Sequence, residues 1–231
     1  LLPLGDVLLS VLRDSEGVWD HLAETVLFRY IRNTAILAMG VVTATVLIGV
    51  TSAWIVTHYE FPGRSIVQWA LILPLAIPSY LLAYAVTDFL QYAGPVQTML
   101  RDAFQWERGE YWFPAARSLP GAICILSAGL YPYVYLACRT ALLQLDNTMI
   151  QSSRTLGAGM VKTFFRVAFP LVSPAVLAGA MLVLMETLAE FGAVDYCAVD
   201  TFATGVYRTW LSHGSLVGAG QLSACLVFVI V

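Results

Sequence analysis

The feature that most constrains this chain is a stretch of uncharged residues long enough to cross a lipid bilayer. It runs from Thr34 to Val56 and contains no charged side chain. A helix needs about 20 apolar residues to cross the hydrocarbon core. A helix also pairs its own backbone N–H and C=O groups, for which lipid offers no hydrogen-bond partners. The stretch therefore predicts a membrane-spanning helix.

The composition of the whole chain agrees with a membrane protein. Hydrophobic residues make up 59% of the 231 residues and charged residues only 12%, whereas a soluble domain carries about 25% charged residues. We therefore expect much of the apolar surface to face lipid. The formal net charge of −3 provides no basic field, so no nucleic-acid partner is expected.

Three further stretches have the length of a membrane span. They run from Ile66 to about Phe89, from Gly121 to Leu143 and from Ser173 to about Cys197. Pro74 and Pro78 interrupt the first of them and free backbone carbonyls, which a membrane tolerates where neighbouring helices or water satisfy them. Kinked helices around a cavity and ordinary kinked packing both fit these prolines.

Weaker apolar patterns lie near the two ends of the chain. Residues 216–231 are apolar but too short to span, and residues 1–12 fit the tail of an earlier span. From residue 19 to residue 31, apolar side chains recur with the spacing of one helix face. This predicts an amphipathic helix at the bilayer surface or against other spans. We expect an all-α fold, a polytopic transmembrane helical bundle, forming one domain over residues 1–231 that is truncated at both ends.

A polar connection between the third and fourth spans predicts two short helices around a corner. The first is expected to begin at Asp146 or Asn147, which are good N-caps, and to end near Leu156. Gly157 follows, and glycine readily adopts the left-handed geometry that ends a helix.

The second short helix carries apolar side chains on one predicted face. They are Val161, Phe164, Phe165 and Ala168. Pro170 is expected to prevent further regular helix before the next span. An apolar ridge outside the bilayer fits a groove on a partner protein. A surface helix lying on membrane lipid is the alternative interpretation.

The same connection resembles the EAA loop of binding-protein-dependent ABC importer permeases. That family's pattern is Glu-Ala-Ala, three residues, Gly, nine residues, Ile, one residue, Leu-Pro. The matching positions here are Gln151, Ser152, Ser153, Gly157, Val167, Phe169 and Pro170. The spacing from glycine to proline is kept in full. Gln151 replaces the family's usual Glu, which removes a charge for a salt bridge to the ATPase.

The resemblance implies a transmembrane (permease) domain of the type I ABC importer (MetI-like) kind in the cell inner membrane. Residues 144–170 would form a cytoplasmic coupling loop, which places residues 91–120 on the periplasmic side. The implied partners are an ABC ATP-binding subunit, a periplasmic substrate-binding protein and a second permease module, fused or separate. The residues implied in coupling to the ATPase are Gln151, Gly157, Val161, Phe164, Phe165 and Pro170.

Two further segments, Leu71–Phe89 and Met185–Trp210, are similar to the ferric-iron branch of these permeases. The implied substrate is iron(III). Relatives that move thiamine, phosphonates or polyamines share much of this architecture and remain alternatives. An ion-coupled secondary transporter is a further alternative, since it would use acids within the spans.

Acidic residues in and after the fourth span are candidates for the translocation pathway. Glu186 lies twelve residues after Pro174, which corresponds to roughly 18 Å of helix. A charged side chain at that depth should face the bundle interior or water. Glu190, one helical turn later, is predicted to share the face of Glu186.

We predict that Glu186 and Glu190, with Asp195, line the pathway. Hydrogen bonding to a neighbouring helix is the alternative role for these acids. Carboxylate oxygens suit a hard cation such as ferric iron, but the pattern assigns no metal site.

The sequence lacks the motif for binding ATP by a phosphate-binding loop. Its only lysine, Lys162, follows Val161, so GAGMVKT does not have the Gly-Lys-Ser/Thr ending. We therefore expect a transport subunit that is not an enzyme and has no cofactor of its own, with ATP bound by the partner subunit.

Overall fold

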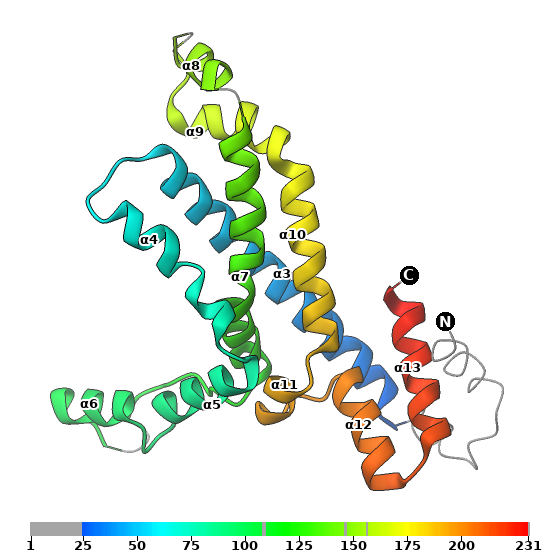
Figure 1. Ribbon diagram of the computed structural model, residues 1–231. Helices are drawn as coiled ribbons and strands as arrows, with labels where there is room; N and C mark the ends of the chain where they lie inside the picture. Colours follow the sequence, from blue (N-terminus) through cyan, green and yellow to red (C-terminus); the bar gives the residue numbers. More distant parts are fainter. Residues whose placement is uncertain (1–24, 108–109, 146, 156, 231) are drawn as a thin grey trace. The chain divides into compact units, whose positions relative to one another are not determined.

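The computed structural model of the chain describes residues 25–107, 110–145, 147–155 and 157–230 (Figure 1). The elements in this part are helices, and it contains no strand, so the predicted all-α fold is confirmed. They are α3 (Leu27–His58), α4 (Arg64–Ala70), the 3-10 helix η1 (Leu73–Ala76), α5 (Ser79–Leu90), α6 (Pro95–Phe104), α7 (Leu119–Gln144), α8 (Asn147–Thr155), α9 (Met160–Thr163), the π-helical turn η2 (Phe164–Ala168), α10 (Phe169–Ala189), α11 (Gly192–Tyr196), α12 (Phe202–His213) and α13 (Leu216–Ile230).

Three of the four predicted spans correspond to single long helices, and the second predicted span is interrupted. Within the described residues, Leu27–His58, Leu119–Gln144 and Met160–Ala189 are long and apolar enough to cross a membrane. Arg64–Ala76 together with Ser79–Phe104 forms a candidate fourth span with a break between its two halves. That break contains Pro78, one of the two prolines that interrupt the apolar stretch in the sequence.

The expected amphipathic helix differs from the structure in its described part. Residues 1–24, and with them the predicted apolar tail and the start of the amphipathic stripe, lie outside the described residues. From Leu27 onward the stripe is the beginning of α3 and not a separate helix. Tyr30 is buried there with Phe202 and Leu222. The buried part of the apolar face is therefore covered by α12 and α13, which agrees with the alternative that it packs against other helices.

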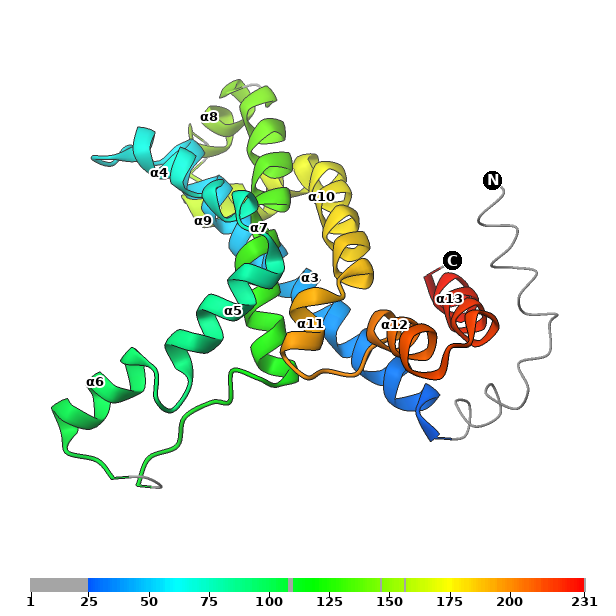
Figure 2. The ribbon, with the colours of Figure 1, turned by 60° about the horizontal axis from the view of Figure 1, so that its bottom comes forward.

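The described residues form two compact units. The first contains the residues before Gly40, Ser79–Ile123 and the residues from Thr187 onward. In this unit α12 and α13 form a helical hairpin (Figure 2). The beginning of α12 is joined to α3, because the Phe202 backbone N–H donates to the Thr34 hydroxyl at 3.1 Å.

The second unit contains Gly40–Pro78 and Cys124–Glu186, and close approach of helix backbones holds it together. A Cβ added at Gly49 on α3 would lie 2.9 Å from the backbone N of Tyr135 on α7. One added at Gly179 on α10 would lie 3.0 Å from the Cα of Val134. Helices in lipid gain stability from such small-residue contacts, because apolar association supplies little there.

Filling the contact between α3 and α7 tests this packing. We expect Gly49→Val to destabilise the protein by about 1–3 kcal/mol, the usual range for overpacking, since the nearest atoms include α7 backbone that cannot rotate away. The midpoint of thermal unfolding in detergent measures this effect. Gly159→Ala is the control, because no atom lies within 4 Å of a Cβ added there. Equal midpoints for both variants would contradict the packing argument.

Candidate functional site: the α8–α9 corner and the acids after α10

The residues from Asn147 to Thr163, called here the α8–α9 corner, form the two short helices that the sequence predicts. Gly157 has φ +81°, so the predicted left-handed backbone is confirmed. The N–H of Ala158 donates to the carbonyl of Ser153 at 3.1 Å. This bond satisfies a carbonyl that the end of α8 would otherwise leave unpaired. The candidate N-cap Asp146 lies outside the described residues.

A side-chain contact holds the two arms of the corner together. The hydroxyl oxygens of Ser153 on α8 and Thr163 on α9 lie 2.9 Å apart. Thr163 is fully buried, whereas Gln151 is exposed on α8. The corner therefore has a fixed angle and an outer surface that is open to a partner.

The predicted apolar ridge on the second helix is divided in the structure. Val161 and Phe165 are 70% and 64% exposed, whereas Ala168 is buried. Phe164 packs against the ring of Trp54 on α3, with ring centroids 4.9 Å apart. The prediction of one continuous exposed ridge is therefore wrong. The π-helical turn is the physical reason, since its wider turn rotates the residues that follow it away from the α-helical positions.

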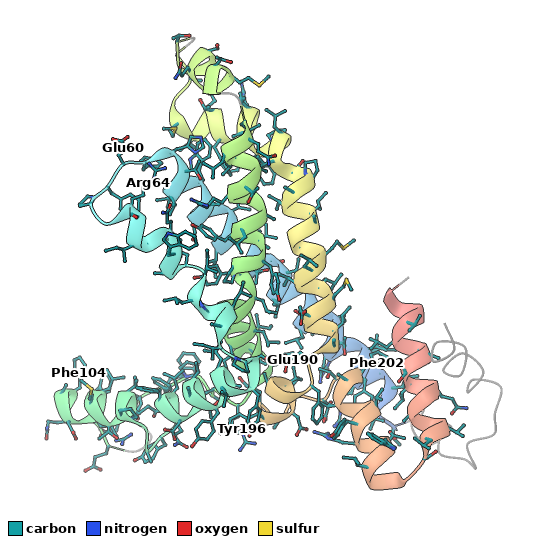
Figure 3. All side chains as sticks on the ribbon, in the orientation of Figure 1. Glu60, Arg64, Phe104, Glu190, Tyr196 and Phe202 are labelled. Atoms are coloured by element: carbon teal, nitrogen blue, oxygen red, sulfur yellow. The ribbon has the colours of Figure 1, made fainter. Side chains whose placement is uncertain are left out.

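The exposed apolar residues of the corner border a cavity of about 610 Å³. Its other wall comes from the end of α3 and the residues after it, with Glu60, which Figure 3 labels, at its exposed side. The lining residues are Thr51, Trp54, Ile55, Tyr59, Glu60, Phe61, Val161, Phe164 and Phe165. The corner thus presents an aromatic groove as well as two protruding apolar side chains.

Pro170 does not interrupt the helix, which corrects the prediction made from the sequence. The helical run is continuous from Met160 to Ala189. Pro170 is the second residue of α10, directly after the π-helical turn. Within this run the proline removes one backbone donor, and it follows directly on the π-helical turn, which already departs from α-helical hydrogen bonding. The corner and the following span are therefore joined by unbroken helix.

The two glutamates of the fourth span do not share a helix face as predicted. α10 ends at Ala189, so Glu186 lies on the helix and Glu190 lies directly after it. Glu186 is exposed. The Glu190 carboxylate accepts hydrogen bonds from the Ser79 hydroxyl at 2.5 Å and from the Ala193 backbone N–H at 2.9 Å.

Asp195 lies in a cluster of opposite charges. Its carboxylate is 3.1 Å from a nitrogen of Arg208, which also pairs with Asp200. Asp200 also lies 3.5 Å from Arg29. Burial lowers the pKa of Arg208, but the hydrogen bonds to Asp200 and Asp195 raise it by more, so the net shift is upward. Within the described residues, no group of three or more His, Cys, Asp or Glu side chains is placed to hold a metal ion.

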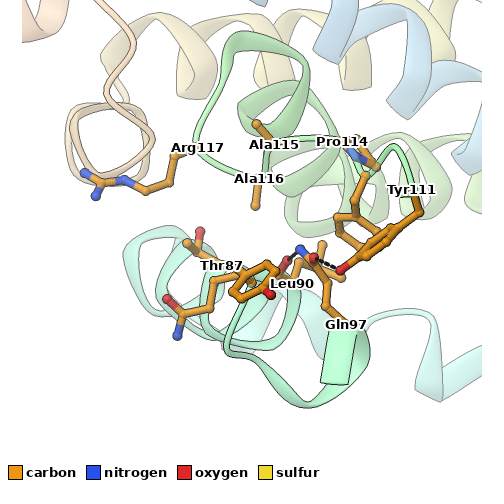
Figure 4. Close-up of a pocket in the computed structure, with 11 residues that line it drawn as sticks. Thr87, Leu90, Gln97, Tyr111, Pro114, Ala115, Ala116 and Arg117 are labelled. Carbon is orange, nitrogen blue, oxygen red and sulfur yellow. Dashed lines mark hydrogen bonds between the residues drawn. The ribbon is translucent and has the colours of Figure 1, made fainter. Parts of the chain in front are cut away.

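A second cavity of about 360 Å³ lies among the end of α5, α6 and the segment before α7 (Figure 4). Gln97 donates to the carbonyl of Leu90 and accepts from the hydroxyl of Tyr111, both at 2.7 Å. The Thr87 hydroxyl is buried without a hydrogen-bond partner among the described residues. Sequence reasoning missed this cavity, because Gln97 on α6 and Tyr111 are 14 residues apart and the contact between them leaves no local pattern.

Solved structures of transporters share this fold. The chain has a TM-score of 0.75 and 18% identity to a chain of the bacterial alginate ABC transporter in complex with alginate pentasaccharide-bound periplasmic protein, covering 98% of this chain and 83% of that one. It has a TM-score of 0.64 and 16% identity to a chain of the MetNI methionine ABC transporter, covering 89% of each. The fold is that of a type I ABC importer permease, as the EAA-like spacing predicts.

The sequence comparison gives the family. Residues 45–231 match the family described as "Binding-protein-dependent transport system inner membrane component". The chain belongs to this family and is an inner-membrane permease.

Two relatives illustrate the range within the family. The chain is 32% identical over 189 residues to the molybdenum transport system permease protein ModB of Escherichia coli (strain K12), covering 78% of each. It is 26% identical over 202 residues to the Fe(3+)-transport system permease protein FbpB 2 of Haemophilus influenzae, covering 85% of this chain and 35% of that protein.

A bulky residue at the corner glycine tests what the left-handed turn does. Gly157→Val places a β-branched side chain at φ +81°, a conformation that costs L-residues about 1–2 kcal/mol. We expect the variant to remain in the membrane and to lose the coupling between ATP hydrolysis and transport. Both activities are measured in the same liposomes, with Gly159→Ala as control. Unchanged coupling in Gly157→Val would contradict a coupling role for the corner.

Proposed function

We infer that this permease forms the translocation pathway of an ABC importer for iron(III), delivered by a periplasmic binding protein and driven by a separate ATP-binding subunit. The observation that carries this proposal is the α8–α9 corner, with Gly157 in the left-handed conformation and the EAA-like spacing. A fixed, exposed bend at the beginning of a span is a suitable contact for a subunit that supplies force.

The contact proposed for the ATP-binding subunit is the outer surface of the corner. Val161 and Phe165 protrude from it and Gln151 is exposed on the first arm. Phe164 supports the second arm from inside through its contact with Trp54. Exposed apolar side chains beside a groove are the kind of surface that a partner protein covers.

Force received at the corner has a direct route into the membrane. The helix that begins at Met160 continues without interruption to Ala189, and its 30 residues correspond to about 45 Å at 1.5 Å per residue. An unbroken helix transmits a displacement along its axis more directly than a loop would. Displacement of the corner is therefore expected to move the far end of α10, which is how the pathway would change the side to which it opens.

The proposed site for the binding protein is the segment between the broken span and α7. Because α7 is a span, its two ends lie on opposite sides of the bilayer. A cytoplasmic α8–α9 corner therefore puts residues 91–118 on the periplasmic side. The alginate transporter described above was solved with a periplasmic protein bound. A second permease module, fused or separate, would complete the pathway.

The acids remain proposed pathway residues, and the structure supports them to different degrees. Glu186 is exposed on α10 and so presents its carboxylate to whatever adjoins that helix. Glu190 and Asp195 are also proposed to border the pathway, but their carboxylates are engaged by Ser79, Ala193 and Arg208. We therefore regard Glu186 as the first candidate for contact with the substrate.

Iron(III) is proposed because of the similarity of Leu71–Phe89 and Met185–Trp210 to the ferric-iron branch. The alignment with the Fe(3+)-transport permease, which extends over 202 residues, supports it. Molybdate is the second candidate, because the molybdenum permease has the higher identity of 32%. Hard carboxylate ligands favour a cation over an oxyanion.

Truncating the protruding apolar pair tests the contact with the ATP-binding subunit. We expect the double substitution Val161→Ala and Phe165→Ala to weaken binding of that subunit about tenfold or more, because a side chain that anchors the centre of an interface costs about 2 kcal/mol or more when it is truncated. The measurement is the amount of ATP-binding subunit that copurifies in detergent.

The control is a matched pair on α10. Leu177 and Met181 are 66% and 62% exposed and have the same spacing. Their double substitution to Ala should leave copurification unchanged. Equal loss in both double variants would argue against a specific contact at the corner.

Uptake into liposomes tests the substrate. The permease, with its second module and ATP-binding subunit, is reconstituted, and its binding protein is added outside with radiolabelled ferric citrate or molybdate. We expect ATP-dependent accumulation of iron and none of molybdate. Accumulation of molybdate without iron would contradict iron(III) as the substrate and support molybdate, the second candidate. Uptake driven by an ion gradient without ATP would favour the secondary-transporter alternative.

A further inference from the structure

The carboxylate of Glu190 joins the ends of three helices. The residue directly follows α10, which ends at Ala189 (Figure 3). Its Oε2 accepts a hydrogen bond from the hydroxyl of Ser79, the first residue of α5. Its Oε1 accepts from the backbone N–H of Ala193 in the first turn of α11. Both oxygens of this side chain are therefore committed to holding helix ends.

The packing around these hydrogen bonds is close. A Cβ added at Gly192 would lie 3.3 Å from the Cβ of Tyr80, so the start of α11 lies directly against the start of α5. The ring of Tyr196 meets the rings of Tyr80 and Tyr84 edge-on, at centroid distances of 5.7 and 5.9 Å. Edge-on aromatic pairs at this separation are attractive. The start of α5 and the helix α11 are therefore held together by these aromatic contacts as well as by the Glu190 carboxylate.

The end of α11 has an attachment of its own. The Nε of Arg117 donates to the carbonyl of Tyr196 at 3.0 Å, and its guanidinium lies 5.5 Å from the centre of the Tyr196 ring. Figure 4 shows Arg117 extending away from the other labelled residues of the cavity. Because α11 is fixed at both ends, it has little freedom to move independently of α5.

The helical run before α5 is broken at its start. The Ile77 N–H still donates to the carbonyl of Pro74 at 3.1 Å, but Ile77 has extended backbone angles, φ −100° and ψ 119°, and Pro78 follows it. A short extended segment between two helices is the kind of place where a hinge absorbs a change in backbone angles. α5 is therefore attached to the end of α10 through Ser79, and it does not continue the helix that precedes it.

We propose that Glu190 is a positioning residue for transport. Its carboxylate fastens the start of α5 to the corner between α10 and α11, so that displacement of α10 moves α5 with it. This rests on the proposed function, because α10 is displaced only if the α8–α9 corner receives force from an ATP-binding subunit. Hydrogen bonds to a carboxylate are stronger than those between neutral groups, which suits a connection that must carry force.

The experiment removes the hydroxyl partner and leaves the carboxylate in place. Ser79→Ala is reconstituted with the complete transporter, and ATP hydrolysis and substrate uptake are measured in the same liposomes. We expect the amount of substrate transported per ATP to fall about tenfold. Losing a hydrogen bond to a charged group in one of two conformations of the transporter shifts the equilibrium between them by about that factor. ATP hydrolysis should continue. Ser79→Thr keeps the hydroxyl and should restore the ratio.

Two further variants distinguish positioning from ion binding and from misfolding. In a Glu190→Ala background, Ser79→Ala should have no additional effect, because residues that act through one contact are not additive. Thr140→Ala removes a hydroxyl that, among the described residues, bonds within its own helix to the Leu136 carbonyl at 2.8 Å, and this variant should transport normally. Additive effects of Ser79→Ala and Glu190→Ala would overturn the proposal.

An ion-binding role for Glu190 gives a different result. In that case Ser79→Ala leaves transport per ATP unchanged, and Glu190→Ala raises the substrate concentration for half-maximal uptake. This outcome would overturn the positioning role while leaving the importer function intact. If the unmodified transporter shows no ATP-dependent uptake of any tested substrate, the proposed function fails and the positioning role fails with it.

Discussion

The close approach of α3 and α10 to the backbone of α7 is the contact on which the second unit depends. Gly49 and Gly179 permit this approach, because a Cβ at either position would lie 2.9 Å from the backbone N of Tyr135 or 3.0 Å from the Cα of Val134. Any larger residue would therefore clash with α7. In lipid, the apolar side chains of these helices gain little by leaving the surrounding hydrocarbon, so association relies on contact at short range. The glycines therefore determine where three spans meet, and they fix the position of the α8–α9 corner between two of them.

This constraint also explains how an irregular stretch can lie inside an otherwise continuous helix. The π-helical turn at Phe164–Ala168 and the proline that follows it would weaken a helix that stood alone. Here Phe164 is supported by Trp54, Ala168 is buried, and Thr163 is held by Ser153. Neighbouring side chains thus stabilise the turn, and the corner stays rigidly connected to α10.

Much of this architecture was predictable from the sequence because its signals are local. Charge-free stretches of sufficient length predict spans, and a glycine between two short helical patterns predicts a left-handed corner. The errors at the ridge and at Pro170 come from the π-helical turn, whose hydrogen bonding no residue pattern indicated, and the others come from contacts between distant residues. The stripe that includes Tyr30 belongs to α3 because Phe202 and Leu222 cover it. The cavity at Thr87 and Gln97 depends on Tyr111, in a segment whose pattern predicts no element.

The acids illustrate why residue type and spacing are insufficient to assign a role within a membrane protein. An unpaired carboxylate in lipid is costly, so each acid must face water or find a partner. Glu190 meets this requirement through Ser79 and Ala193, and Asp195 through Arg208. Their partners come from other helices and are invisible in the local pattern. Glu186 is the acid of the three for which no hydrogen bond or ion pair is found among the described residues, and it is exposed. A pathway that uses it would need its remaining ligands from outside this chain, which is the arrangement expected if a second permease module closes the pathway.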